Sequence, residues 1–253
     1  MKNKDLTDKY NKIFESGSGK FFSFNNFPES KLLLDMIVDW NDLRVLEIGC
    51  GEGRLAAMIN FAGAAHIDAI DFSEEAIRIA RQRIRLKNVC YQVADYREMK
   101  GTYDVVVLQG VLEHLDNPFI ELKGIIESKL NEGGMVITSS PSFLNPRGYV
   151  WMTLQLLFDI PMSLTDLHSL CPFDFEKFAE ENDYTLEIRS TDQDWGAGER
   201  TIIDFKHRLH NALRDADMDD SKVDTFLDWF KKAVPYHGRD EFSGATVAYK
   251  ICR

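Results

Sequence analysis

The spacing of apolar residues predicts two helices before any strand. Residues 6–15 are polar with a few apolar positions and form the first expected helix. After a Gly/Ser-rich break at 16–19, Pro28 suits the first turn of a second helix. The apolar face of this second helix consists of Leu32, Leu33, Met36, Ile37 and Trp40. Residues 1–42 are therefore predicted to form a helical cap.

From residue 43 onward, strand-like runs alternate with helical stretches. Five strands are expected, at Leu43–Ile48, His66–Ile70, Val89–Val93, Tyr103–Leu108 and Met135–Thr138. Helices are expected between them at Arg54–Phe61, at 73–86 with Ser73 as its N-cap, and at Asn117–Leu130. The nearly continuous apolar run at Tyr103–Leu108 is typical of a central strand that is buried on both faces. This alternation predicts a doubly wound, Rossmann-like α/β sheet.

The alternation stops after residue 140. A helix is expected at Asp174–Glu181, a strand at Tyr184–Ser190, two amphipathic helices within 196–234 and a last strand at Ser243–Ile251. The expected architecture is a seven-stranded, mostly parallel sheet whose last strand is antiparallel. We interpret 1–253 as a single domain with a core at 43–140. Helical inserts at 141–171 and 193–240 are expected to form a lid on the substrate side.

Composition narrows the class of protein. A chain of 253 residues with 44% hydrophobic residues can bury a sizeable core. Its 30 basic and 41 acidic residues give a net charge of −11, which disfavours nucleic acid as a partner. The four cysteines form no CxxC pair, and no apolar stretch reaches the ~20 residues that a membrane span needs. We expect a cytoplasmic protein without a transmembrane segment, either a monomer or a homodimer.

A glycine-rich turn follows the first core strand. Gly49, Cys50, Gly51 and Gly53 lie where the carboxyl end of a parallel strand meets the next helix, and ligands bind at such edges. Gly53 comes one place too early for a dinucleotide fingerprint. A carboxylate at Glu47 also suits a cationic ligand better than a pyrophosphate.

Four segments in the expected order resemble the motifs of class I S-adenosylmethionine-dependent methyltransferases. Glu47-Ile48-Gly49-Cys50-Gly51-Glu52-Gly53 is similar to the first motif, and the segment 108–118, with Leu112-Glu113-His114, looks like that of small-molecule methyltransferases of ubiquinone and menaquinone biosynthesis. The resemblance implies S-adenosylmethionine as cofactor and S-adenosylhomocysteine as product. It also implies ribose binding by Asp71, contact with the adenine amino group by Asp95, and flanking of the adenine by Phe72 and Tyr96. Gln109 and Gly110 are expected to contact the cofactor as well.

His114 follows the fourth strand and is a candidate catalytic base, because imidazole can take a proton from a hydroxyl acceptor near neutral pH. The alternative is that His114 only holds the loop. Glu113 is interpreted as a hydrogen-bonded loop acid, with pairing to His114 or to a divalent ion as alternatives. No metal site is predicted.

The aromatic segment Tyr149–Phe158, together with 164–168, is the candidate substrate lid. An aromatic stripe at helical spacing is more often plain core, and this reading is preferred for Leu154, Leu157 and Phe158. The expected substrate-binding residues are Tyr149, Trp151, His168, Trp195 and Arg200, and His168 is a second candidate base. Arg147 is a further candidate for holding an anionic group.

The resemblance therefore predicts a methyltransferase that acts on an oxygen, nitrogen or carbon atom of a small molecule by direct in-line displacement. Two alternatives stay open. One is a tRNA-modifying methyltransferase, and the other is a non-catalytic protein that binds S-adenosylmethionine. An NAD-dependent dehydrogenase ranks below both because of the glycine spacing.

Overall fold

The computed structural model describes residues 4–15, 27–83, 85–161, 166–191, 199–237 and 242–253. The side chains of 4–9, 199 and 200 are outside this description. The α-helices are α1 (Lys4–Glu15), α3 (Phe27–Asp35), α4 (Arg54–Phe61), α5 (Glu74–Arg83), α6 (Pro118–Lys129), α7 (Pro146–Phe158), α8 (Pro172–Glu181), α9 (Glu199–Asp215) and α10 (Val223–Ala233). Short 3₁₀ turns lie at η1 (Tyr96–Glu98), η2 (Leu112–His114) and η3 (Val234–Tyr236).

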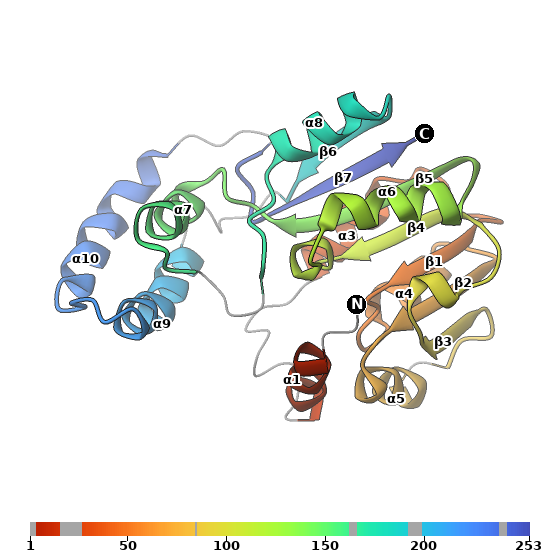
Figure 1. Ribbon diagram of the computed structural model, residues 1–253, viewed down its shortest axis with the longest axis horizontal. Helices are drawn as coiled ribbons and strands as arrows, with labels where there is room; N and C mark the ends of the chain where they lie inside the picture. Colours follow the sequence, from red (N-terminus) through yellow and green to blue (C-terminus); the bar gives the residue numbers. More distant parts are fainter. Residues whose placement is uncertain (1–3, 16–26, 84, 162–165, 192–198, 238–241) are drawn as a thin grey trace.

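One mixed sheet organises the molecule (Figure 1). Its strands are β1 (Arg44–Ile48), β2 (His66–Asp71), β3 (Val89–Val93), β4 (Tyr103–Gln109), β5 (Leu130–Pro141), β6 (Thr185–Ser190) and β7 (Thr246–Cys252), in the order β3-β2-β1-β4-β5-β7-β6. Strands β1 to β5 are parallel, and β7 is antiparallel to both of its neighbours. The strand order reverses between β1 and β4, so the crevice at their carboxyl ends is where a ligand is expected in such a sheet.

Alternating strand residues feed two cores on opposite faces of the sheet. Val45 of β1 packs in one core with α3, α4 and α5, whereas the next residue, Leu46, packs in the other with α6 and α8. Strand β4 contributes to both cores in the same way, through Val105 and Val106. Because successive side chains of a strand point to opposite faces, a central strand covered on both sides must be apolar at almost every position.

Helices α7, α9 and α10 form a separate group beyond the tips of β4 and β5, at the left of Figure 1. They have a small core of their own, in which Trp151 of α7 packs against Phe205 of α9, with ring centroids 5.9 Å apart. A buried ion pair between Arg147 Nε and Asp204 Oδ2 (2.8 Å) joins α7 to α9. None of the described helices is both long and apolar enough to cross a membrane.

The predicted fold class is confirmed, including the single antiparallel strand β7. Ser73 is the expected cap of α5, because its Oγ accepts the Ala76 N–H (3.1 Å). The prediction was less accurate for β5, which begins at Leu130 rather than Met135. Gly133 and Gly134 lie inside β5, where Gly133 has φ +73° and the pairing with β4 is irregular. Pairing of Leu130 with Tyr103 extends the strand across this irregularity.

Glycine at position 148 is required by the way α7 leaves the sheet. Its N–H donates to the capping Asn145 Oδ1 (2.8 Å), and a Cβ at this position would lie 2.3 Å from the main chain of Phe143. We predict that Gly148→Ala lowers the free energy of unfolding by about 2–4 kcal/mol, because backbone cannot move aside as a side-chain tip can. Urea denaturation measures this change.

Gly124→Ala is the matched control for that variant. Gly124 lies inside α6, and its nearest neighbour would be the hydroxyl of Tyr96, 3.4 Å away. Alanine has a better helix propensity than glycine, worth up to about 1 kcal/mol, and this gain offsets the cost of the contact with Tyr96. Equal losses of stability in the two variants would contradict the packing argument.

Candidate active site

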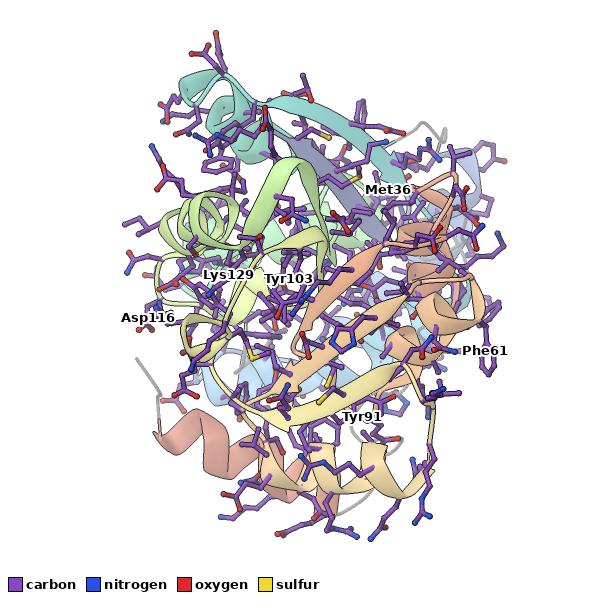
Figure 2. All side chains as sticks on the ribbon, turned by 90° about the vertical axis from the view of Figure 1, so that its right-hand side faces the viewer. Met36, Phe61, Tyr91, Tyr103, Asp116 and Lys129 are labelled. Carbon is purple, nitrogen blue, oxygen red and sulfur yellow. The ribbon has the colours of Figure 1, made fainter. Side chains whose placement is uncertain are left out.

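The glycine turn after β1 is wound by residues in the left-handed region. Gly49, Gly51 and Gly53 have φ values of +75°, +51° and +79°. The N–H groups of Gly49 and Cys50 both donate to the carbonyl of Ile70 on β2, at 2.8 and 3.0 Å. A Cβ at Gly53 would lie 2.5 Å from the hydroxyl of Tyr91, the β3 residue labelled in Figure 2. A Cβ at Gly49 would lie 2.5 Å from Val111 Cγ2, so Gly49 and Gly53 have no room for a side chain, whereas Gly51 is favoured by its positive φ alone.

Asp71, at the carboxyl end of β2, holds this turn and the next helix together. Its Oδ2 accepts the Gly51 N–H (2.9 Å) and its Oδ1 accepts the Ser73 N–H (2.8 Å). Burial raises the pKa of Asp71, and the hydrogen bonds from Ser73 and Gly51 oppose this shift. Each carboxylate oxygen can accept a second hydrogen bond, so Asp71 is fixed in place with acceptor capacity to spare.

Glu47 is buried within β1, directly before the glycine turn. Its Oε2 accepts no hydrogen bond from the residues that the structure describes. Burial, reinforced by the neighbouring Asp71 carboxylate and opposed by the backbone of Ala56, raises the pKa of Glu47 to about 8. A buried carboxyl oxygen with an unused lone pair is costly, and a cationic ligand placed beside it would favour the ionised form.

Asp95 and Tyr96 lie beyond the end of β3, as predicted, but both are engaged by a neighbouring arginine. Asp95 caps η1, accepting the Arg97 N–H (2.9 Å) and pairing with the Arg97 guanidinium (3.0 Å). The Tyr96 hydroxyl donates to Glu121 Oε2 (2.7 Å), and the Arg97 guanidinium lies 4.7 Å from the centre of the Tyr96 ring. A contact between Asp95 and a cofactor would share the carboxylate with Arg97.

Helix α3 contacts the tips of β4 and β5. Ser30 Oγ donates to Gln109 Oε1 (2.9 Å), and Ser139 Oγ donates to Glu29 Oε1 (2.8 Å). Gly110, with φ +62°, donates its N–H to the Ser139 carbonyl (3.1 Å). The predicted residues Gln109 and Gly110 are thus at the crevice, and α3 covers this end of it.

Helix α1 covers the opposite end. The ring of Tyr10 makes edge contacts with Phe72 (5.5 Å between centroids) and with His114 (5.9 Å). Ser73 Oγ donates to Asn11 Oδ1 (2.6 Å), and Phe14 packs against Ala76 and Ile79 of α5. Helix α1 therefore lies over the carboxyl ends of β1 and β2, and it brings Tyr10 between two residues predicted for the site.

His114 and His168 both lie at this edge. His114 Nδ1 lies 3.4 Å from Asp166 Oδ1, and His168 Nε2 lies 3.3 Å from the Asp116 carbonyl. Glu113 is buried, and its Oε2 has no hydrogen-bond partner among the described residues. Burial raises the pKa of Glu113 well above its usual value. The carboxylate beside the His114 ring nitrogen is thus that of Asp166. It stands where the alternative interpretation expected Glu113.

The predicted lid residues have different surroundings. Tyr149 is 53% exposed, whereas Trp151 is fully buried in the core of the insert and is not placed to line an open pocket. Arg147, considered for an anionic substrate group, is buried in the ion pair with Asp204. Trp195 and the side chain of Arg200 lie outside the described residues.

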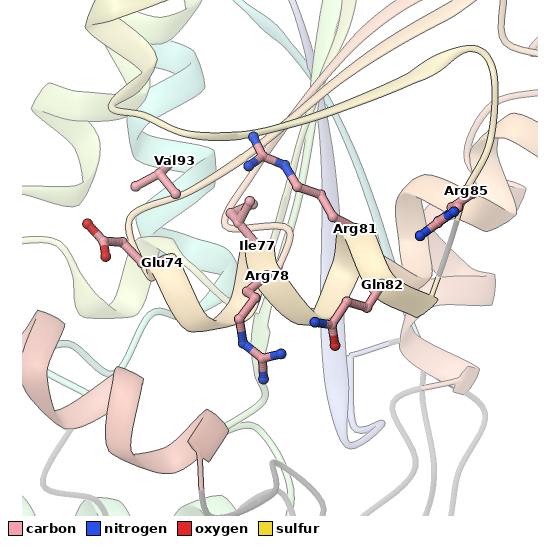
Figure 3. A pocket seen from close by; sticks show the side chains of 7 residues that line it. All are labelled: Glu74, Ile77, Arg78, Arg81, Gln82, Arg85 and Val93. Atoms are coloured by element: carbon pink, nitrogen blue, oxygen red, sulfur yellow. The ribbon is translucent and has the colours of Figure 1, made fainter.

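A surface hollow lies away from the crevice, between α5 and Val93 of β3 (Figure 3). Its lining includes Arg78 and Arg81, which point outward from the helix. Arg78 pairs with Glu75, and Arg81 donates to the Tyr91 carbonyl on the edge strand. The hollow is open to the surface, and both arginines already have partners within the protein, so we do not assign the cofactor to it. Within the described ranges, no group of three or more His, Cys, Asp or Glu side chains could hold a metal ion.

A doubly wound sheet of this order, with a glycine turn and buried acids at the switch point, is the fold of class I methyltransferases. The sequence model of the family described as "Methyltransferase domain" matches residues 45–134. The four motifs all lie within these residues, so this part of the chain is similar to the methyltransferase domain of that family.

Two relatives illustrate the sequence similarity. The ubiquinone biosynthesis O-methyltransferase of Neisseria meningitidis serogroup C is 30% identical over 141 residues, covering 53% of this chain and 58% of that protein. The malonyl-[acyl-carrier protein] O-methyltransferase of Bacillus anthracis is 34% identical over 91 residues, covering 35% and 32%. The matched stretch thus spans 58% of the first relative and 32% of the second, less than two thirds of either protein.

Solved structures extend the likeness of fold over most of the chain. A methyltransferase from Archaeoglobus fulgidus has a TM-score of 0.59 at 18% identity, covering 93% of this chain and 97% of the other. One from Mesorhizobium loti has a TM-score of 0.55 at 14% identity, covering 89% and 98%. At these identities the likeness concerns the fold.

Sequence reasoning did not identify Tyr10, Glu29 or Asp166 as residues of the crevice. The first two lie on helices recognised only as a cap, and Asp166 lies in the proposed lid. For Asp166, the available signal was that it is a polar residue in an otherwise largely apolar segment just before His168. Nothing local to them indicates which core residue each one meets.

The raised pKa of Glu47 predicts a pH-dependent stability. Between the ordinary glutamate pKa of about 4.3 and the native value of about 8, the native state keeps a proton that the unfolded chain has lost. This contribution to stability is full below pH 4 and is lost as the pH rises to 8. The loss is up to about 1.4 kcal/mol per pH unit. Glu47→Gln should remove this decline, so its stability relative to wild type rises from pH 5 to 8.

Urea denaturation at several pH values tests this prediction. Glu132→Gln, a change at an exposed position of β5, is the control and should follow the wild-type curve. Parallel curves for wild type and Glu47→Gln would show that Glu47 is ionised in the native state.

Proposed function

We propose that this chain transfers a methyl group from S-adenosylmethionine to an oxygen, nitrogen or carbon atom of a small-molecule acceptor. The observation that carries the proposal is the buried Glu47 carboxyl, whose Oε2 has no hydrogen-bond partner among the described residues, next to Asp71 and the glycine turn. Because this turn lies within the matched domain 45–134, site chemistry and family similarity point to the same ligand.

The residues of the site fit a sulfonium cofactor. Glu47 would lie toward its positive charge and ionise on binding, since an opposite charge favours the carboxylate. Asp71 would accept from the ribose hydroxyls with the lone pairs that Gly51 and Ser73 leave unused. The adenine ring would be surrounded by Phe72, Asp95 and Tyr96. The cofactor would lie along the glycine turn, formed by Gly49, Cys50, Gly51 and Gly53. Its far side would be closed by Gln109 and Gly110.

The cofactor supplies the methyl group: its carbon–sulfur bond breaks, the electron pair stays on sulfur, and a bond from the acceptor atom to the methyl carbon forms. The chain contributes position and water exclusion, the main sources of rate for such a displacement. His114, under Tyr10, is the proposed base for an acceptor proton, and His168 is the second candidate.

The name of the ubiquinone biosynthesis O-methyltransferase supports a small-molecule acceptor. Tyr149 and His168, with Trp195 and Arg200, remain the proposed acceptor-binding residues. A cytoplasmic location also belongs to the proposal and rests on the four free cysteines.

Calorimetry with S-adenosylmethionine tests the cofactor site. We expect saturable binding by the wild-type protein and none by a variant that combines Glu47→Ala with Asp71→Ala. Because Asp71 also anchors the glycine turn, the single variant Glu47→Gln is measured as well. It should keep the fold and weaken binding about ten-fold or more. Full affinity in the double variant would refute the site assignment, and Glu132→Ala serves as the unaffected control.

A turnover assay tests the activity. Cell extract, separated into low-molecular-weight, RNA and protein fractions, is supplied with methyl-labelled cofactor and the enzyme. We expect S-adenosylhomocysteine release and label in the small-molecule fraction. His114→Gln should lower kcat by about 100-fold or more without changing cofactor affinity. His66→Gln, at the exposed amino end of β2, is the control. Label in RNA would favour a tRNA-modifying enzyme, and binding without turnover would favour a non-catalytic protein.

A further inference from the structure

The carboxylate of Asp166 lies against the imidazole of His114, although the two residues come from different parts of the chain. Asp166 Oδ1 is 3.4 Å from His114 Nδ1, and the two side chains are 19% and 18% exposed. Asp166 belongs to the proposed lid, whereas His114 ends the η2 turn after β4. The pair therefore connects a segment outside the matched domain 45–134 with a residue inside it.

Main-chain hydrogen bonds hold Asp166 in this place. The N–H groups of the next two residues, Leu167 and His168, both donate to the Glu113 carbonyl, at 2.8 and 3.2 Å. The η2 turn is itself closed by a hydrogen bond from the His114 N–H to the Val111 carbonyl (3.1 Å). Since both partners sit on hydrogen-bonded backbone, the position of the carboxylate beside the ring is built into the fold.

The imidazole is also restrained on another side. The ring of Tyr10 meets it edge-on, with an interplanar angle of 69°. Glu113, the other acid of the turn, has no partner for its Oε2 among the described residues, and the carboxylate that lies at the ring nitrogen is that of Asp166. An imidazole with a carboxylate on Nδ1 and an aromatic ring against it has one preferred orientation and one preferred tautomer.

We propose that Asp166 is a positioning residue for His114 and that the acceptor is a hydroxyl compound. This inference rests on the proposed methyltransferase function. The Asp166 carboxylate accepts a hydrogen bond from Nδ1–H of His114, so the proton stays on Nδ1 and the lone pair of the ring lies on Nε2. As the acceptor oxygen attacks the methyl carbon, the hydroxyl proton passes to Nε2, and the Asp166 carboxylate stabilises the resulting imidazolium. A carbon–oxygen bond forms, the carbon–sulfur bond breaks, and the proton stays on His114 until solvent removes it.

A hydroxyl group needs such a base because its oxygen is a weak nucleophile while it keeps its proton. An uncharged amine already carries an available lone pair, so a carboxylate-oriented imidazole would bring it little. This difference is the reason for assigning an alcohol or phenol to the site. A purely mechanical role, in which Asp166 only fastens the lid segment to η2, predicts lost stability but no change in the chemistry of the ring.

The tautomer of His114 separates these roles and requires no acceptor. Long-range proton–nitrogen NMR on protein with ¹⁵N-labelled histidine, at pH 8.5, distinguishes a protonated Nδ1 from a protonated Nε2. The His114→Gln variant assigns the signals. We expect the Nδ1–H form in wild type and a mixed or Nε2–H form in Asp166→Asn. Asp116→Asn, an exposed change in the same loop, should keep the wild-type spectrum.

Two results would overturn the proposal: an Nε2–H tautomer in the wild-type protein, or an unchanged Nδ1–H tautomer in a folded Asp166→Asn variant. Calorimetry on the same samples keeps the two hypotheses apart. If Asp166 acts as proposed, Asp166→Asn binds S-adenosylmethionine within about two-fold of wild type, and with a hydroxyl acceptor its kcat falls about ten-fold or more. If the wild-type protein does not bind S-adenosylmethionine, the methyltransferase function is rejected. The tautomer of His114 would still show whether Asp166 orients the ring. Label transferred only to an amine would reject the assigned acceptor class.

Discussion

The buried carboxylate of Asp71 is the interaction on which the arrangement of the crevice depends. One of its oxygens accepts from Gly51 in the glycine turn, and the other accepts from Ser73 at the start of α5. It therefore fixes the end of β1, the end of β2 and the entry to α5 relative to one another. The Ser73 hydroxyl also donates a hydrogen bond to Asn11, which links α1 to this arrangement. Burial of a charged group is tolerable here because several N–H donors satisfy it.

The crevice is closed from outside the sheet by segments that belong to no recognised motif. Helix α1 places Tyr10 on Phe72 and His114, while α3 binds Gln109 and Ser139. The stretch Asp166–His168, which lies between α7 and α8, docks on the η2 turn. In the proposed function, the common sheet would hold the cofactor and the extra segments would surround the acceptor. Differences among relatives of this fold are expected in those segments, since loops and inserts carry specificity on a rigid scaffold.

Much of the core was predictable from the sequence because its signals are local. The apolar run at Tyr103–Leu108 indicated a central strand, and Ser73 marked the start of α5. Predictions failed where packing between distant segments decides. Trp151 was expected at a pocket because it has a polar end, yet it is the centre of the insert core against Phe205. Arg147 was a candidate for anion binding, yet Asp204 of a later helix neutralises it in the interior.

By itself, the sequence determined the strand–helix order, the glycine turn and the acids near the carboxyl ends of β1, β2 and β3. These features depend on periodicity, backbone conformation and residue type over a few neighbours. Only the tertiary structure decided that one Glu47 oxygen lacks a hydrogen-bond partner within the described part of the chain, and that Asp166 rather than Glu113 meets the His114 ring nitrogen. The physical reason is that burial and pairing are properties of contacts between segments. Such contacts form when the cores close, and no local pattern specifies which side chain each one brings to the crevice.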